Sequence, residues 1–338
     1  MLTKSAVVTL GPPHDKPWWW KHLALDGERC HLEYVRLVYK GRYSQDIPTA
    51  EIPVVMLRVL RQLLSWRRRY SHVFTTEFDL VGLSIAFWQT VTGMRRPKHV
   101  IIQFIMRERQ QTVRSRAKYA LMRFLFLSVH RVVVSSTLEM EYYRKAFAWP
   151  SRKVVFVPIL TSPELLDRMP VEEEDFYIAA GRTFRDYDTL LRAIVGTNLK
   201  VLIVGGGGAA TRYSGLENVR AVENISFSDL ESLMLRSRAV VVPLQDRAIS
   251  VGQSVVLQAM ALGKAVVATR TAGTIDYIDH MNDGMLVAPG DEQELRDALL
   301  LLESADLRRK LGTRARSRVA KMHLPKHYAE SIRKAIVV

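Results

Sequence analysis

The sequence is poor in cysteine and in long apolar runs, and both shortages exclude classes of protein. Cys30 is the one cysteine among 338 residues, so an internal disulfide is impossible, and no group of cysteine and histidine has metal-ligand spacing. No stretch approaches the roughly 20 consecutive apolar residues that a membrane-spanning helix needs, and the start of the chain does not have the pattern of a signal peptide. We therefore expect a globular cytoplasmic protein, long enough for two domains.

Acidic residues are scarce in the first half of the chain. The net charge is +15, and residues 1–158 account for all of it, with 26 lysines and arginines against 11 acidic residues. A localised positive field indicates an anionic partner, which can be a membrane surface, nucleic acid or an acidic acceptor. The sequence has no helix-turn-helix, zinc-finger or aromatic RNA-binding signature, so we favour a membrane surface over nucleic acid.

Residues 1–160 alternate between short apolar strands and helices, a pattern typical of a parallel α/β sheet. We expect strands at 4–10, 31–39, 71–75, 100–106, 131–136 and 153–158, and helices at 52–69, 80–92, 110–128 and 137–148.

Two of these expected helices, 52–69 and 110–128, are amphipathic and basic. Either one can lie on an anionic lipid surface, but cations also stabilise a helix C-terminus, and a charged face is usually just solvated. Residues 18–20 are three adjacent tryptophans, which cannot all face one core. They indicate either plain packing or contact with a lipid interface.

Residues 239–291 contain the most informative pattern in the chain. Two valine-rich runs, 239–243 and 265–269, are typical of parallel strands buried on both faces, and a helix expected at 254–262 completes a βαβ unit. The loop before this helix leads into its N-terminus, where backbone amides and the helix dipole favour a bound phosphate. The alternative is that Gly252 only makes a tight turn and Ser254 caps the helix.

The order of features in this stretch is that of a known family. It runs through the helix end 257–261 (LQAMA), Gly263, the strand 265–269, Gly273 with Asp276, and the turns 282–284 and 289–291. In this order it resembles the C-terminal domain of retaining glycosyltransferases of the GT-B fold, family four (glycosyl transferases group 1). The resemblance implies two Rossmann-like α/β domains whose parallel sheets face a cleft. Residues 1–160 would form the acceptor-side domain and 161–323 the nucleotide-sugar domain, with a helix at 324–338 packing back on the first.

The resemblance also implies a site. Arg182 and Arg185 stand where the family has an arginine and a lysine that grip the donor diphosphate, so we expect them to be catalytic through charge neutralisation. The donor-binding residues would be Ser250, Gly252, Gln253, Ser254, Gln258 and, beside the nucleotide base, Ile225; the acceptor-side residues would be Gly11 and Gln103.

Three of these positions depart from the family pattern. Ser250 and Gln258 replace a pair of glutamates; glutamine still hydrogen-bonds ribose, whereas serine is too short to reach the sugar. Gln103 or Phe104 stands where the family often has a histidine.

The pair Asp186 and Asp188 raises the question of a metal, because Asp-x-Asp holds a divalent ion in the other large glycosyltransferase fold. Here the pair opens a helix, where acidic side chains cap backbone amides, so we expect no metal and no other cofactor. The implied function is the retaining transfer of a hexose-type sugar from a nucleotide-diphosphate donor to a glycan or lipid-linked acceptor. It would take place at the inner membrane face, in polysaccharide or glycolipid synthesis. Two alternatives stay open: a degenerate relative that binds nucleotide or glycan without turnover, and a basic module that binds a membrane or nucleic acid.

Overall fold

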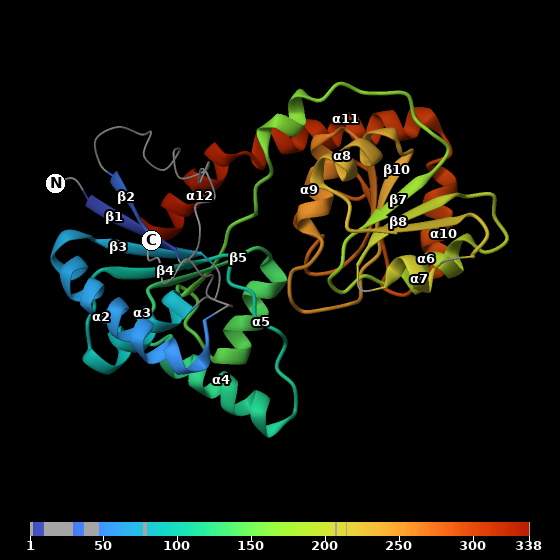
Figure 1. Cartoon of the computed structure of the whole chain (residues 1–338). Helices are drawn as coiled ribbons and strands as arrows, with labels where there is room; N and C mark the ends of the chain where they lie inside the picture. The colour runs from blue at the N-terminus through green and yellow to red at the C-terminus, as the bar shows by residue number, and fades with distance from the viewer. Residues whose placement is uncertain are drawn as a thin grey trace. The chain divides into compact units, whose positions relative to one another are not determined.

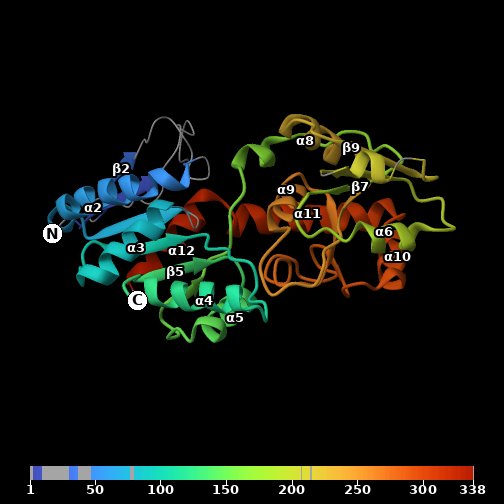
Figure 2. The ribbon, with the colours of Figure 1, turned by 60° about the horizontal axis from the view of Figure 1, so that its bottom comes forward.

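The computed structural model describes residues 3–9, 30–36, 47–76, 80–206, 208–213 and 215–337. The chain divides into two compact units, one made of Met1–Val157 with Tyr328–Val338 and the other of Pro158–His327 (Figure 1, Figure 2). The chain passes from the first unit to the second between residues 157 and 158, and the sequence analysis placed this boundary between residues 160 and 161. The chain returns to the first unit within its last helix, α12 (Pro325–Val337).

The first unit is built on a parallel sheet with the strand order β2-β1-β3-β4-β5-β6. Its strands are β1 (Thr3–Thr9), β2 (Cys30–Arg36), β3 (His72–Thr76), β4 (Lys98–Ile102), β5 (Arg131–Val134) and β6 (Val154–Phe156). Its other helices are the 3-10 turn η2 (Thr49–Glu51), α2 (Ile52–Arg69), α3 (Leu80–Thr92), α4 (Val113–Leu125) and α5 (Thr137–Phe147). Helices α2 to α5 each contact the next, and Figure 1 shows α12 on the other side of the sheet.

The second unit is built on a parallel sheet with the order β12-β11-β10-β7-β8-β9. Its strands are β7 (Tyr177–Ala180), β8 (Val201–Gly205), β9 (Val219–Glu223), β10 (Ala239–Val242), β11 (Ala265–Thr269) and β12 (Met285–Val287). Its helices are the 3-10 turn η3 (Pro163–Asp167), α6 (Tyr187–Ile194), α7 (Ala209–Arg212), α8 (Phe227–Arg236), α9 (Gln253–Ala261), α10 (Glu292–Leu301) and α11 (Ala305–Met322).

Both faces of this second sheet are covered, which explains the unbroken valine runs of its strands. Because successive side chains of a strand point to opposite faces, Val240 and Val242 of β10 enter one apolar cluster and Val241 the other. The first cluster packs against α9 through residues such as Met260, and the second against α10 through residues such as Leu299. The sheet is thus the middle layer of a three-layer sandwich.

The strand order of the second unit reverses between β7 and β10. From β7 the chain moves outward through β8 to β9, then crosses back through α8 to β10 and moves outward the other way to β12. In an open parallel sheet, ligands bind at the carboxyl ends of the strands beside such a reversal. The loops after β7 and β10 are therefore the place to look for a site.

The helices expected from the sequence were confirmed for α2 and α3 and, to within one residue, for α5 and α9; the helix expected at 110–128 differs. The helix expected at 254–262 is α9, and its N-cap is Gly252 with no side-chain cap bond, so the alternative in which Ser254 caps it is wrong. The helix expected at 110–128 is shorter, because the Thr112 hydroxyl caps it by accepting from the Ser115 amide. No helix among the described residues has both the length and the apolar character needed to cross a bilayer.

A partly buried ion cluster fastens the entry segment of the second unit to its helices. Glu173 accepts from Lys264 Nζ and Arg308 Nη2, each at 2.7 Å, and both cationic side chains are less than a tenth exposed. Burial by itself raises the pKa of Glu173, but the hydrogen bonds from Lys264 and Arg308 outweigh it, so the pKa lies below its usual value of 4.5. The pKa of Lys264 is lowered, because its burial outweighs the attraction of Glu173.

Replacing Glu173 with glutamine is expected to destabilise the protein by about 2 kcal/mol near neutral pH, between the values typical of exposed and of buried pairs. Because the folded pKa of Glu173 is depressed, its contribution is present above the unfolded pKa and is lost as the pH falls through the folded value. Urea unfolding at several pH values checks this: the gap between wild type and Glu173→Gln should close in acid. The control is Glu174→Gln, whose ion pair with Arg236 is about half exposed and should change stability little. Equal losses in the two variants would contradict the account.

Candidate functional site

The loops after β7 and β10 are joined to each other by backbone hydrogen bonds. The Asp186 amide donates to the Pro243 carbonyl at 3.0 Å, and the Gln245 amide donates to the Phe184 carbonyl at 3.0 Å. Arg185 and Leu244 form an isolated antiparallel bridge between these two bonds. The two loops that the sequence analysis selected are therefore one structural element at the reversal of the sheet.

Arg185 holds the shape of the first loop. Its Nε donates to the Ala180 carbonyl at 2.9 Å and its Nη1 to the Thr183 carbonyl at 3.0 Å. Gly181 has a φ of +128°, and a Cβ there would lie 2.1 Å from Nη2 of Arg185, so only glycine leaves room for the guanidinium. Burial lowers the pKa of Arg185, with Tyr187 acting in the opposite direction. These contacts show that Arg185 holds the loop in place, and the diphosphate contact that the sequence analysis expected of it stays a prediction.

Arg182 is the exposed cation of the same loop. Its aliphatic carbons lie on Gly206 at the end of the neighbouring strand β8, where a Cβ would come within 3.0 Å of its Cγ and Cδ. The Arg182 guanidinium forms no ion pair within the described part of the chain. It is thus free to bind an anion, and it lies on the β8 side of the loop in this structure.

The start of α9 follows the second loop. Gly252 takes φ +89° as the N-cap, and a Cβ there would lie 2.9 Å from Leu244 Cδ1, so the turn also needs glycine for packing. The carbonyl of Gly252 accepts from the Val255 and Val256 amides, which begins the helix. The first amides of a helix have no acceptor inside it and favour an anion.

Gly273, in the loop after β11, packs directly against the backbone that precedes α9. A Cβ on Gly273 would lie 1.9 Å from the Val251 carbonyl oxygen and 2.6 Å from its nitrogen, so the two backbones are in direct contact. The Thr274 hydroxyl ties the same loop to β11 by donating to the Thr269 carbonyl at 2.6 Å. The position of the loop before α9 therefore depends on a side chain being absent at 273.

The predicted donor-binding residues differ in how exposed they are to solvent. Ser254 is exposed at the start of α9, Gly252 and Gln258 are half-buried, and Gln253 is buried. Ser250 is 1% exposed, so it contacts a donor only if the loop moves. Ile225 is half-buried and packs against the apolar cluster that includes α9, after the turn at Asn224 with φ +55°. Each of these donor contacts stays a prediction.

Of the two predicted acceptor-side residues, the structure describes one. Gln103 follows β4 and takes φ +55°, an unusual conformation for a residue with a side chain and one that is concentrated at functional sites. Its left-handed backbone also explains why β4 ends at Ile102, where the sequence analysis expected the strand to continue to residue 106. Gly11 and the tryptophans 18–20 lie outside the described residues.

Sequence reasoning missed a third arginine in this region. Arg247, in the loop after β10, has its guanidinium carbon 4.8 Å above the Phe184 ring and donates to Gln245 at 3.0 Å. It thereby adds a cation–π contact to the backbone bonds that join the two loops. In the sequence, the position of Arg247 between a buried strand and the glycine before a helix could have indicated that it belongs to this site.

The Asp-x-Asp pair caps and braces a helix, as the sequence predicted. Asp186 is the N-cap of α6 and accepts from the Thr189 amide and hydroxyl at 3.2 and 2.7 Å. Asp188 accepts from Arg212 Nη2 at 2.8 Å. Among the residues that the structure describes, no group of three or more acidic, histidine or cysteine side chains is arranged to hold a metal ion.

Comparison with known proteins agrees with this geometry. Residues 181–304 match the family described as Glycosyl transferases group 1. Over 46 residues the chain is 46% identical to sucrose-phosphate synthase 4 of Arabidopsis thaliana, and this match spans 14% of the chain and 4% of that protein.

Solved structures share the fold of the whole chain. Sucrose-phosphate synthase from Thermosynechococcus elongatus is similar with a TM-score of 0.70 at 16% identity, over 98% of each chain. HepE of Anabaena in complex with UDP is similar with a TM-score of 0.70 at 13% identity, over 99% of this chain and 100% of that one. HepE has also been solved in complex with UDP-glucose. The resemblance inferred from the sequence is therefore confirmed at the level of the fold: the chain has the two-sheet GT-B fold of these structures, and residues 181–304 of its second unit match the Glycosyl transferases group 1 family.

Proposed function

We propose that the chain is a glycosyltransferase that moves a hexose from a nucleotide-diphosphate donor to an acceptor hydroxyl, with retention of the anomeric configuration. The observation that carries the proposal is that the loop with the exposed Arg182 is hydrogen-bonded to the loop that leads into α9, at the reversal of a parallel sheet. The family match covers both loops of this element. UDP is the nucleotide we favour, because HepE, which shares the fold, binds UDP and UDP-glucose.

The chemistry that this element would perform is stabilisation of the leaving group. When the bond between the sugar and the donor phosphate breaks, negative charge grows on the nucleoside diphosphate. Arg182 and the first amides of α9 would bind that charge, with Arg185 and Arg247 holding the loops in place. Such fixed donors cost no reorganisation during the reaction, and each hydrogen bond to a charged group contributes about 1.5–3 kcal/mol. No step of this scheme requires a metal ion.

Retention requires that the acceptor hydroxyl attack the same face of the sugar that the diphosphate leaves. A diphosphate that remains bound by Arg182 can take the proton of that hydroxyl as the new bond forms. The reaction then needs an oxocarbenium-like transition state and no protein nucleophile, which fits a site without a glutamate at position 250 or 258.

The acceptor that we propose is a glycan or a lipid-linked sugar at the inner, anionic face of a membrane. Helix α4 supports this, because it presents apolar and cationic side chains to solvent together. Val113, Leu121 and Phe124 are each 47–83% exposed, and Arg114, Arg116, Lys118 and Arg123 are exposed beside them. A helix of this kind can lie in the headgroup region of an anionic bilayer.

Turnover of a donor panel tests the proposal. The full chain is incubated with UDP-glucose, GDP-mannose or ADP-glucose and with vesicles that carry a lipid-linked sugar, and release of the nucleoside diphosphate is measured. We expect release from the uridine donor, dependent on the acceptor and unchanged by EDTA, with an α-linked product from an α-linked donor. Loss of activity in EDTA would contradict metal independence.

A second function is favoured by one observation, the burial of Ser250 where the family has a donor-contacting glutamate. A chain that binds nucleotide through Arg182 but cannot hold the sugar would be a binding protein without turnover. In the same assay it would bind UDP and release no diphosphate above the protein-free blank from any of the three donors.

A further inference from the structure

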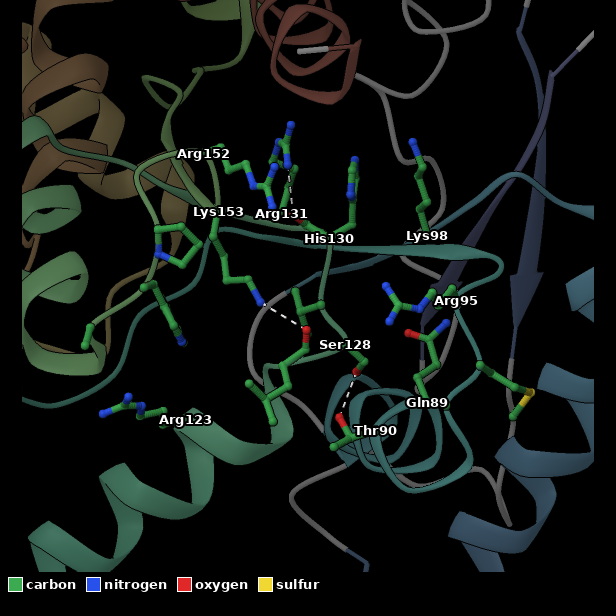
Figure 3. A pocket seen from close by; sticks show the side chains of 17 residues that line it. Gln89, Thr90, Arg95, Lys98, Arg123, Ser128, His130, Arg131, Arg152 and Lys153 are labelled. Carbon is green, nitrogen blue, oxygen red and sulfur yellow. Dashed lines mark hydrogen bonds between the residues drawn. The ribbon is translucent and has the colours of Figure 1, made fainter.

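The first unit contains a cavity that the proposed sugar transfer does not use. It has a volume of about 810 Å³ and lies where strands β4, β5 and β6 begin, at the opposite end of the strands from Gln103 (Figure 3). Its walls come from the end of α3, residues 93–98, the end of α4 and residues 148–153. The parallel pairing of the three strands brings these segments together.

The described residues that line the cavity include a cluster of cations. Six of its described lining residues are lysine or arginine, and none is acidic: Arg95, Lys98, Arg123, Arg131, Arg152 and Lys153. Within the described ranges, none of these six forms an ion pair. Figure 3 shows Lys153 and Arg95 reaching into the hollow from opposite sides.

One of the six cations, Arg131, is buried, and a second, Lys153, is half-buried. Arg131 is 5% exposed, and its guanidinium donates to the carbonyls of Ala335 and His130 at 3.2 and 3.1 Å, with no carboxylate. Lys153 donates to the carbonyls of Phe126 and Leu127 at the end of α4. Burial, with the nearby charges of Arg152 and Arg131, lowers the pKa of Lys153 to about 8. Buried charges are normally paired, and no carboxylate among the described residues pairs with Arg131, so its guanidinium can still bind an anion.

Some neighbouring polar groups are already used inside the protein. The Thr90 hydroxyl lies 2.9 Å from both the Leu125 carbonyl and the Ser128 hydroxyl, and the Gln89 amide donates to the Pro97 carbonyl at 2.7 Å. Three other polar atoms of lining residues have no partner in the described structure: Gln89 Oε1, His130 Nε2 and Trp149 Nε1. The charged donors in the cavity are the guanidinium and ammonium groups. Arginine forks match phosphate oxygens in geometry, and lysine adds a point charge.

We propose that this cavity is a second anion site, which binds a ligand with clustered phosphate groups through Arg95, Arg152 and the four cations around them. The ligand is either a soluble polyphosphate ester or the phosphate headgroup of a lipid, and both would present the same chemistry. The site is independent of the nucleotide site proposed in the second unit, so either can exist without the other.

The test compares two double variants with the same loss of charge. Arg95→Gln/Arg152→Gln removes two cavity cations that are exposed and form no hydrogen bond or ion pair in the described structure, so folding should be unaffected. Arg67→Gln/Arg68→Gln is the matched control, because it removes two exposed cations from the end of α2, outside the cavity. The probes are inorganic pyrophosphate, measured by calorimetry with excess UDP present, and phosphatidylcholine vesicles containing phosphatidic acid, measured by flotation.

We expect the cavity variant to bind pyrophosphate at least about tenfold more weakly than both wild type and the control, since each hydrogen bond to a charge is worth about a factor of ten. A matching loss on phosphatidic acid vesicles would identify a lipid headgroup as the ligand, and unchanged flotation would identify a soluble phosphate. If the cavity variant binds both probes as the control does, the proposal is wrong.

Discussion

Replacing Arg182 with alanine is expected to weaken UDP binding roughly tenfold to a hundredfold, the range typical of one hydrogen bond to a charged group. The thermal unfolding midpoint should hardly change, because Arg182 is exposed and its guanidinium makes no ion pair within the described residues. Calorimetric titration with UDP gives the affinity directly.

The matched control for this variant is Arg220→Ala. Arg220 is an exposed arginine of the same unit, on the edge strand β9, away from the loops at the reversal of the sheet. It should bind UDP as wild type does. Equal affinities of Arg182→Ala and Arg220→Ala would show that Arg182 does not contact the diphosphate.

The second large effect is expected from Gly273→Ala. The new methyl group would meet the Val251 carbonyl oxygen, which is backbone and cannot turn aside, so the loop before α9 must shift. We expect a loss of about 1–3 kcal/mol of stability, as for other overpacked sites, together with loss of measurable UDP binding. Urea unfolding and calorimetry at a temperature well below the unfolding transition separate the two effects.

Gly312→Ala distinguishes damage to the site from damage to the fold. A Cβ on Gly312 of α11 would lie 1.9 Å from the Gly263 carbonyl oxygen, the same kind of clash, but beyond the C-terminal end of α9, away from its N-terminus. This variant should lose similar stability and keep its UDP affinity. If Gly273→Ala also binds UDP normally, the contact with Val251 is not part of the site.

The sequence was sufficient for the layers of the fold, because the signals were local. Valine runs predicted buried parallel strands, and α2 and α3 have the bounds that their apolar periodicity predicts. The predicted end of strand β4, residue 106, was wrong, since the strand ends at Ile102. Phe104 and Met106 continue its apolar run and are buried, but the positive φ of Gln103 ends the strand before them. A run of apolar residues indicates that they are buried, but it does not show whether they are buried in a strand or in the loop that follows it.

The loops of the candidate site could be predicted from the sequence, but the contacts of their side chains could not. Family resemblance selected both Arg182 and Arg185, but the carbonyls of Ala180 and Thr183 that engage Arg185 are brought into place only by the folded turn. The cationic cavity was missed for the same reason. Lys98, Arg131 and Lys153 are ordinary flanking charges in the sequence, and only the register of three parallel strands gathers them.

The most direct test of the central claim is hydrogen exchange of the full chain with and without UDP. The account predicts that UDP slows exchange in residues 181–186 and 249–256, the two loops at the reversal of the second sheet and the first turn of α9. Slowed exchange confined to other segments, while UDP is bound, would contradict it.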